Sequence, residues 1–158
     1  MSGHFALDGR LAADTRHVAS LPLCELLLMN DARFAWLVLV PRKAGMVEIA
    51  DLADTEQRTL WSEVNQAAAA LRACAPCDKL NLGALGNIVR QLHVHVVARR
   101  EGDAAWPGPV WGSGAAQAYA PEALAQLIAN LRQRKIKKPA IARGLLAGPK
   151  RAQRCDGS

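Results

Sequence analysis

The order of apolar and polar residues predicts a sheet built from short strands with tight connections. Two apolar runs are separated by residues 31–35, which is typical of two antiparallel strands joined by a short turn. Pro41 closes the second run because proline cannot donate to a strand ladder. Gly86-Asn87 joins two further apolar segments. We therefore expect strands at residues 25–30, 36–41, 79–85 and 90–98, with a first strand or hairpin within residues 5–11.

Two helices are predicted by apolar residues that recur at helical spacing. The first begins at a capping box with Asp54 as N-cap and Gln57 three residues later, and it ends before Pro76. The second spans residues 122–134, with Pro121 near its first turn. The stripe of the first helix consists of Leu60, Trp61, Val64, Ala67, Ala68 and Leu71. Together these elements indicate an α+β fold, an antiparallel sheet with one main packed helix and a C-terminal helix.

One predicted strand alternates polar and apolar side chains and carries most of the candidate chemistry. A strand has a side-chain period of two, so Gln91, His93 and His95 are expected on one face. Imidazole can attack as a nucleophile, shuttle a proton or bind a metal. A polar face without function also fits this pattern. A metal site needs further His or carboxylate ligands, and the other two histidines, His4 and His17, lie in a loop-rich N-terminus.

The segment Gln91-Leu92-His93-Val94-His95-Val96-Val97 resembles the signature of the histidine triad family of nucleotide hydrolases and transferases. That signature is His-φ-His-φ-His-φ-φ, with φ apolar. In one register Gln91 stands first and His93 and His95 follow; in a rival register His93 is first, His95 second and Val97 third. We prefer the former because family members often end with two apolar residues, a small residue or proline, and arginine. Val96-Val97-Ala98-Arg99 fits that ending.

Three further segments support the resemblance, which covers about residues 5–120. Asn81-Leu82-Gly83 and Gly86-Asn87-Ile88-Val89 resemble the Asn-x-Gly and Gly-Gln-x-Val segments of the family. Residues 106–112, Trp-Pro-Gly-Pro-Val-Trp-Gly, resemble the tail of a bacterial branch associated with dinucleoside polyphosphate hydrolases. The two tryptophans of this tail either cover an edge of the core or form a wall of the binding pocket by stacking.

The resemblance implies a fold and a reaction. The fold would be a five-stranded half-barrel, and two copies would form a homodimer that joins their sheets. His93 would be the nucleophile of a metal-independent nucleotide hydrolase or nucleotidyl transferase that acts at an α-phosphate through a nucleotidyl-histidine intermediate. His95 would donate to the phosphate oxygens. The expected substrates are dinucleoside polyphosphates or nucleoside phosphoramidates, without a cofactor. The other expected nucleotide- and phosphate-binding residues are Asn30, Asn81, Gly86, Asn87, Ile88 and Val89.

Two positions depart from the family pattern. Gln91 can donate and accept a hydrogen bond but cannot titrate. It either substitutes for a histidine that only orients groups, or it makes the turnover of substrates with poor leaving groups slow. It therefore favours the alternative of a nucleotide-binding protein with little or no turnover. Ile88 stands where many members carry serine or threonine. Asn30 ends a strand before a turn, where asparagine is also common for backbone reasons alone.

Charge is distributed unevenly along the 158 residues. The net charge is +6, yet residues 1–131 hold 11 basic and 13 acidic residues, so the basic charge lies in residues 132–158. We expect a nucleotide-binding domain over 1–131 and a basic, flexible tail over 132–158, which leaves a basic-tailed interaction module as a further alternative. The tail lacks aromatic residues for base stacking, so nucleic-acid binding is not expected.

The chain has neither a signal-peptide pattern nor an apolar run of membrane-spanning length, so we expect a cytoplasmic protein that does not bind a membrane. Cys74 and Cys77 form a lone C-x-x-C without a second ligand pair, which favours free thiols over a zinc site. Cys24 is expected in the core.

Overall fold

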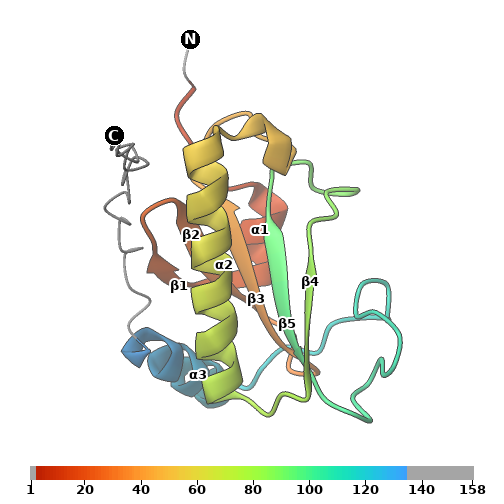
Figure 1. The fold of residues 1–158 in the computed structure, drawn as a ribbon. Coiled ribbons are helices and arrows are strands. Elements are labelled where there is room, and N and C mark those ends of the chain that lie inside the picture. The colour runs from red at the N-terminus through yellow and green to blue at the C-terminus, as the bar shows by residue number, and fades with distance from the viewer. Residues whose placement is uncertain (1–2, 135–158) are drawn as a thin grey trace, which may run out of the picture.

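The computed structural model describes residues 3–134, which fold around a five-stranded antiparallel sheet (Figure 1). The strands are ordered β1-β2-β3-β5-β4, so β4 forms one outer edge and β5 lies between β4 and β3. This architecture confirms the α+β fold with an antiparallel five-stranded sheet. The strands are β1 (Thr15–Ser20), β2 (Cys24–Met29), β3 (Ala35–Pro41), β4 (Lys79–Gly83) and β5 (Val94–Arg99).

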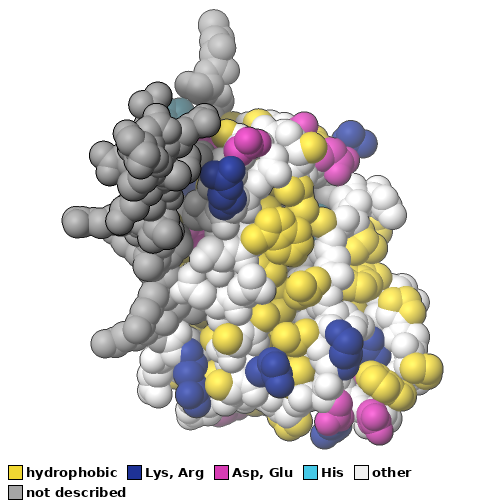
Figure 2. Space-filling model, viewed as in Figure 1, with side chains coloured by type: hydrophobic (Ala, Val, Ile, Leu, Met, Phe, Trp, Pro, Cys, Tyr) yellow, Lys and Arg dark blue, Asp and Glu magenta, His cyan; other side chains and the backbone are white. Residues whose placement is uncertain are grey.

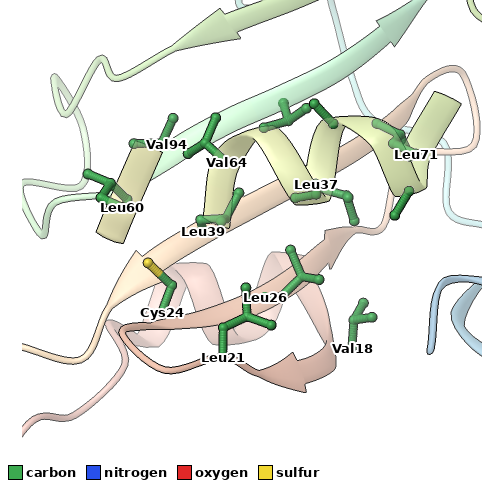
Figure 3. Close-up of a cluster of buried hydrophobic side chains, with 14 of the residues drawn as sticks. Val18, Leu21, Cys24, Leu26, Leu37, Leu39, Leu60, Val64, Leu71 and Val94 are labelled. Atoms are coloured by element: carbon green, nitrogen blue, oxygen red, sulfur yellow. The ribbon is translucent and has the colours of Figure 1, made fainter. Parts of the chain in front are cut away.

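Helix α2 (Asp54–Cys74) covers one face of the sheet and supplies six of the nineteen buried residues of the main core. Its inward residues pack on alternate residues of the central strands, as period-two strands require (Figure 3). Cys24 is fully buried in this core, as expected. Helix α3 (Pro121–Gln133) packs against α2 and β1, and a short 3-10 helix (Ile49–Asp51) precedes α2. The labelled core residues include Leu26, Leu37, Leu39, Leu60, Val64, Leu71 and Val94.

The opposite face of the sheet is covered by a short helix and by the segment that follows β5. Helix α1 (Gly9–Asp14) inserts Leu11, and the later segment inserts Val110. They pack against the other set of alternating strand residues, which includes Val38 and Val97. Because His95 precedes Val97 by one strand period, the histidine side chain belongs to this second face.

The expected first strand within residues 5–11 is wrong. The Asp8 side chain instead accepts the N–H of Arg10 at 2.8 Å and begins α1, and the first strand follows as β1. Strand β1 lies at the edge of the sheet, and both Arg16 and His17 are exposed. An edge strand with polar residues on successive positions lacks the apolar pattern by which strands are recognised.

The N-cap of α2 also differs from the prediction. Asp54 is already inside the helix, and the cap is Ala53, whose N–H donates to the Glu56 carboxylate at 3.0 Å. Trp61 does not join the core with the rest of its predicted stripe, because 43% of its surface is exposed. Within residues 3–134, no helix combines the length and apolar character that a membrane span requires.

The predicted start of the basic tail, residue 132, lies in α3. The guanidinium of Arg132 donates through Nε to the Val18 carbonyl oxygen at 2.8 Å, which ties the end of the helix to β1. The tail expected beyond this helix, with Cys155, falls on residues 135–158, outside the described part of the chain.

Candidate functional site

A pocket of about 530 Å³ opens on the sheet face opposite α2. Its walls come from α1, the ends of β2 and β3, the segment after β4, the start of β5 and the segment after β5. The size suits a small organic ligand. Of the residues predicted to be functional, the pocket brings together His93, His95, Asn30, Gly86, Asn87, Ile88 and Val89.

His93 stands just before β5, and its imidazole has a defined proton position. Its Nδ1 lies 2.6 Å from the carbonyl oxygen of Gln91. A carbonyl oxygen only accepts, so Nδ1 carries the proton and donates it. In the neutral ring, Nε2 then has a free lone pair. His93 is 7% exposed and lines the pocket, so this lone pair belongs to a nearly buried imidazole nitrogen that is chemically able to attack an electrophile.

His95 has the opposite tautomer. Its Nδ1 lies 3.0 Å from Nε1 of Trp36, and the indole N–H can only donate. His95 Nδ1 is therefore the acceptor, and the proton of the neutral ring is on Nε2. Burial, and then the nearby His93, lower the pKa of His95 to about 3. His95 is accordingly neutral at physiological pH and carries an N–H donor on the ring next to His93.

The two imidazoles lie close together within an aromatic enclosure. Their ring centroids are 4.7 Å apart with the planes at 81°. Trp36 and Trp111 contact His95 edge-on, with centroids at 5.4 and 5.6 Å. Gly83 pairs with His95 across β4 and β5, and a Cβ there would lie 2.9 Å from Cη2 of Trp111. Glycine at this position therefore leaves the space that Trp111 occupies over His95.

The segment after β4 forms one side of the pocket. Gly86 has φ +69°, a conformation that favours glycine, and it turns the chain so that residues 86–89 line the cavity. Ile88 is 79% exposed, so its side chain is an apolar group at the pocket mouth. Backbone N–H groups and the Asn87 amide are the available donors on this side.

The other end of the pocket lies across the sheet, towards β2 and α1. Asn30 follows β2, and its Oδ1 accepts the N–H of Tyr119 at 3.1 Å, which leaves its amide N–H₂ as a donor. Asp31 pairs with Arg33 at 2.7 Å. Burial raises the pKa of Asp31, but hydrogen bonds from Arg33 and the Gln117 N–H outweigh it and hold the pKa below its usual value.

Two predicted site residues have their side chains engaged elsewhere. The Gln91 amide bonds the N-terminal segment: Oε1 accepts the Asp8 N–H at 2.9 Å, and Nε2 donates to the Ala6 carbonyl at 2.8 Å. Asn81 lies on β4, and its Oδ1 accepts from the buried Arg99 at 2.8 Å. Neither residue lines the pocket.

Sequence reasoning missed Trp36, Arg10 and Asp31 as pocket residues. Trp36 offered one signal, since it is the single N–H-bearing aromatic residue in an otherwise aliphatic strand. Within residues 3–134, no group of three or more His, Cys, Asp or Glu side chains is placed to hold a metal ion. Cys74 and Cys77 are partly exposed free thiols.

Comparisons with known proteins agree on one family. Residues 10–102 match the HIT domain family model. A histidine triad protein from Bradyrhizobium japonicum is 45% identical with a TM-score of 0.82, covering 84% of this chain and 98% of its own. A histidine triad (HIT) protein from Sinorhizobium meliloti is 48% identical with a TM-score of 0.80, covering 82% and 96%. One from Marinobacter aquaeolei is 42% identical with a TM-score of 0.81, covering 84% and 96%. No curated protein matched the sequence.

Proposed function

Because the chain belongs to the histidine triad family, we propose that it is a metal-independent nucleotide hydrolase or nucleotidyl transferase acting at an α-phosphate. Membership of this family suggests nucleotide binding with hydrolase or transferase activity. The observation that carries the finer proposal is the pair of opposite tautomers. His93 has a free Nε2 lone pair, and His95 beside it has an Nε2–H. One ring can attack phosphorus while the other donates to its oxygens.

The reaction then proceeds in two displacements. His93 Nε2 attacks the α-phosphorus, a P–N bond forms, and the bond to the leaving group breaks with its electron pair. Nδ1 keeps its proton and donates it in a hydrogen bond to the Gln91 carbonyl oxygen, which stabilises the positive charge that the ring acquires. Water next attacks phosphorus and loses a proton to solvent, the P–N bond breaks with its electron pair returning to His93 Nε2, and a nucleoside monophosphate leaves. An acceptor other than water would give nucleotidyl transfer.

His95 and the segment after β4 stabilise the charge on phosphate. The Nε2–H of His95 donates to a non-bridging oxygen as negative charge grows there. Backbone N–H groups of residues 86–89 and the Asn87 amide supply donors from the opposite side of the pocket. Because His95 stays neutral, it donates without adding a second positive charge next to the developing His93 cation.

The tautomers also support one register of the motif over the other. In the rival register His95 would be the nucleophile. Its Nδ1 is occupied by the Trp36 N–H, and its Nε2 carries the proton, so no lone pair is free for attack. His93 is the ring whose free nitrogen can act.

The nucleoside is proposed to lie across the strands. Strand β3 lies between β5 and β2, and the pocket runs from His95 past Trp36 of β3 to Met29 at the end of β2 and then to Asn30. Neighbouring strands are about 4.8 Å apart, so two strand spacings give roughly 10 Å between the histidines and this end. We place the ribose near the free amide of Asn30 and the base beyond it. The leaving group then points towards residues 86–89.

Trapping the intermediate tests the proposal. The protein is mixed with a dinucleoside polyphosphate or a nucleoside phosphoramidate, quenched under denaturing alkaline conditions, and measured by intact-protein mass spectrometry. We expect a covalent nucleoside monophosphate that is released in water, unaffected by a chelator. His93→Ala should show no adduct and lose roughly three or more orders of magnitude in turnover while staying folded. If His95→Ala is the inactive variant and His93→Ala turns over, the register is wrong.

The second candidate is a nucleotide-binding protein with little or no turnover. Gln91 favours it, because its amide bonds the N-terminal segment and brings no titratable group to the leaving group. Calorimetric binding of a nucleoside monophosphate, without adduct or turnover for any substrate in the panel, would support this candidate. The basic-tailed module is tested by deleting residues 135–158 and measuring partner binding.

A further inference from the structure

The tautomer of His95 depends on a single hydrogen bond from a neighbouring strand. We propose that Trp36 is a positioning residue that holds His95 in the Nε2–H form and so fixes which ring nitrogen faces the phosphate. This inference rests on the proposed function for its effect on turnover, but its first consequence, the proton position in His95, is independent of any substrate.

The chemistry of the donor makes the assignment unambiguous. An indole nitrogen has a proton and no available lone pair, so a bond from Trp36 Nε1 can only end on an unprotonated nitrogen. The distance to His95 Nδ1 is 3.0 Å. A glutamine in place of Trp36 could either donate or accept, and would leave both tautomers of His95 accessible. A histidine still offers an N–H but can also accept, so it would hold the tautomer only in part.

The packing of Trp36 keeps this bond in place. Trp36 is 8% exposed and His95 6%, so water has little access to compete for Nδ1. Phe34 contacts the Trp36 ring edge-on at 6.4 Å, and Trp111 does so at 6.2 Å. The indole is therefore held on two sides within the cluster that Leu11, Val38 and Val97 also build.

Sheet register explains why the bond forms. Trp36 pairs with Val97 across β3 and β5, and His95 pairs with Val38. Trp36 and His95 are thus diagonal neighbours on the same face, about 7–8 Å apart along the sheet, within reach of a large aromatic side chain. Because both residues are on paired strands rather than loops, the backbone fixes the bond.

The consequence for the site is a matched pair of rings. A backbone carbonyl fixes the proton of His93 on Nδ1, and Trp36 fixes that of His95 on Nε2. Without Trp36, the neutral His95 ring would exchange between two tautomers, and in one of them a lone pair would face the phosphate oxygens. Repulsion between that lone pair and the oxygens disfavours the transition state.

Two substitutions of Trp36 separate the hydrogen bond from the packing. Trp36→Phe keeps a large ring and removes the N–H. Trp36→His removes the six-membered ring but keeps an N–H, because imidazole Nε2 occupies the same place in its five-membered ring as indole Nε1. If Trp36 acts only by packing, the histidine variant should be the more damaged. If it acts through the bond, the phenylalanine variant should be.

The first measurement is the ¹⁵N spectrum of the histidine side chains in the full-length protein, with His95→Gln used to assign the signals. In the wild type we expect His95 Nδ1 to have the shift of an unprotonated nitrogen. This signal should move towards the protonated position in Trp36→Phe. In Trp36→His it should lie closer to the wild-type value, because the imidazole N–H can still donate to Nδ1 although the ring can also accept. Trp111→Phe is the matched control: it changes an edge contact to His95 but no bond to it, so the tautomer should persist.

The second measurement is steady-state turnover. For Trp36→Phe we expect kcat to fall about 3- to 10-fold, the value of one neutral hydrogen bond, with KM nearly unchanged. Trp36→His should recover part of this loss in kcat while unfolding at a lower temperature. Trp106 lies outside the pocket, so Trp106→Phe should match the wild type in both the ¹⁵N spectrum and the turnover.

Each outcome decides a separate question. An unchanged His95 tautomer in Trp36→Phe overturns the inference, as does a loss of kcat that follows stability across the two Trp36 variants. If the wild type turns over no nucleotide, the proposed function fails. The ¹⁵N spectra of Trp36→Phe, Trp36→His and Trp111→Phe then still decide whether Trp36 sets the proton position in His95.

Discussion

The ion pair between Arg99 and Asp103 should contribute strongly to stability at neutral pH, in a way that acid removes. Two contacts join the groups, Nε to Oδ2 at 2.7 Å and Nη2 to Oδ1 at 2.9 Å, and the side chains are 1% and 6% exposed. The Arg99 hydrogen bonds lower the pKa of Asp103 from 3.8 to about 2. That shift corresponds to about 2 kcal/mol of folding free energy.

Asp103→Asn should cost somewhat more than this at pH 7. Removing one partner leaves the other charge buried, which typically costs about 3–5 kcal/mol. Asn81 still bonds Arg99 through Oδ1 at 2.8 Å, so we expect the lower part of that range, about 3 kcal/mol. Asp103 also accepts the N–H of Ala105 at 3.0 Å, so the loop that leads to Trp111 should loosen.

The sign of the pH dependence follows from the lowered pKa. Stability from Asp103 is fully present above its ordinary pKa of 3.8 and disappears as the pH falls towards 2. Urea unfolding of the wild type and Asp103→Asn, followed from pH 7 to pH 3, should show a gap that narrows below about pH 4. Glu101→Gln, exposed in the same loop, should change stability by less than about 0.5 kcal/mol. A gap that does not depend on pH would refute the reasoning.

Two further predictions concern the surface and the aromatic enclosure. Hydrophobic side chains gather over α2 and towards the edge strand β4 (Figure 2). They include Leu82 of β4, which is 45% exposed, and Trp61 of α2, which is 43% exposed. We expect this surface to form a homodimer interface. Light scattering at micromolar concentration should give a dimer mass and Trp61→Glu a monomer; a wild-type monomer contradicts the interface. Gly83→Ala should displace Trp111 and lower the free energy of unfolding by about 1–3 kcal/mol, measured by thermal unfolding. Gly9→Ala is the control, because a Cβ at Gly9 meets open space and should not lower stability in this way.

The sequence predicted well those elements whose pattern is local. The strands expected at 25–30 and 36–41 appear as β2 and β3 within one residue at each end, because both are buried apolar runs. The helix expected over 122–134 appears as α3. Strand β1 was missed because it is a polar edge strand, and β5 begins four residues late because the Leu92 N–H donates to Met46 instead of a strand partner.

The pocket residues predicted from the sequence are those that lie in a local motif or a family-like segment, such as His93, His95 and residues 86–89. His93 and His95 stand out because they alternate with apolar residues in the sequence. Trp36 precedes His95 by 59 positions, and only the pairing of β3 with β5 brings it into contact. Asn81 falls in a family-like segment, but the buried Arg99 claims its carbonyl oxygen. A local motif does not reveal which polar side chains are already satisfied by distant partners.

Gln91 shows how a distant partner changes the expected role of a motif residue. From its position in the motif, an effect on the leaving group is expected, so that Gln91→His would accelerate substrates with poor leaving groups through general acid catalysis, worth roughly a hundred- to ten-thousand-fold in favourable cases. In the structure its amide instead bonds both Ala6 and Asp8, which precede the helix that lines the pocket.

An imidazole has one N–H and one acceptor nitrogen on a shorter frame, so it cannot reproduce both bonds. Gln91→His should therefore loosen residues 5–14 and raise KM by a similar factor for every leaving group. A leaving-group series measures this, with hydrogen exchange of the Asp8 amide as the structural readout. Gln91→Glu, which keeps the acceptor for Asp8 but loses the donor to Ala6, should give an intermediate loss. Selective acceleration of the poorest leaving groups would instead show that residue 91 reaches the departing atom, and that the N-terminal clamp is dispensable.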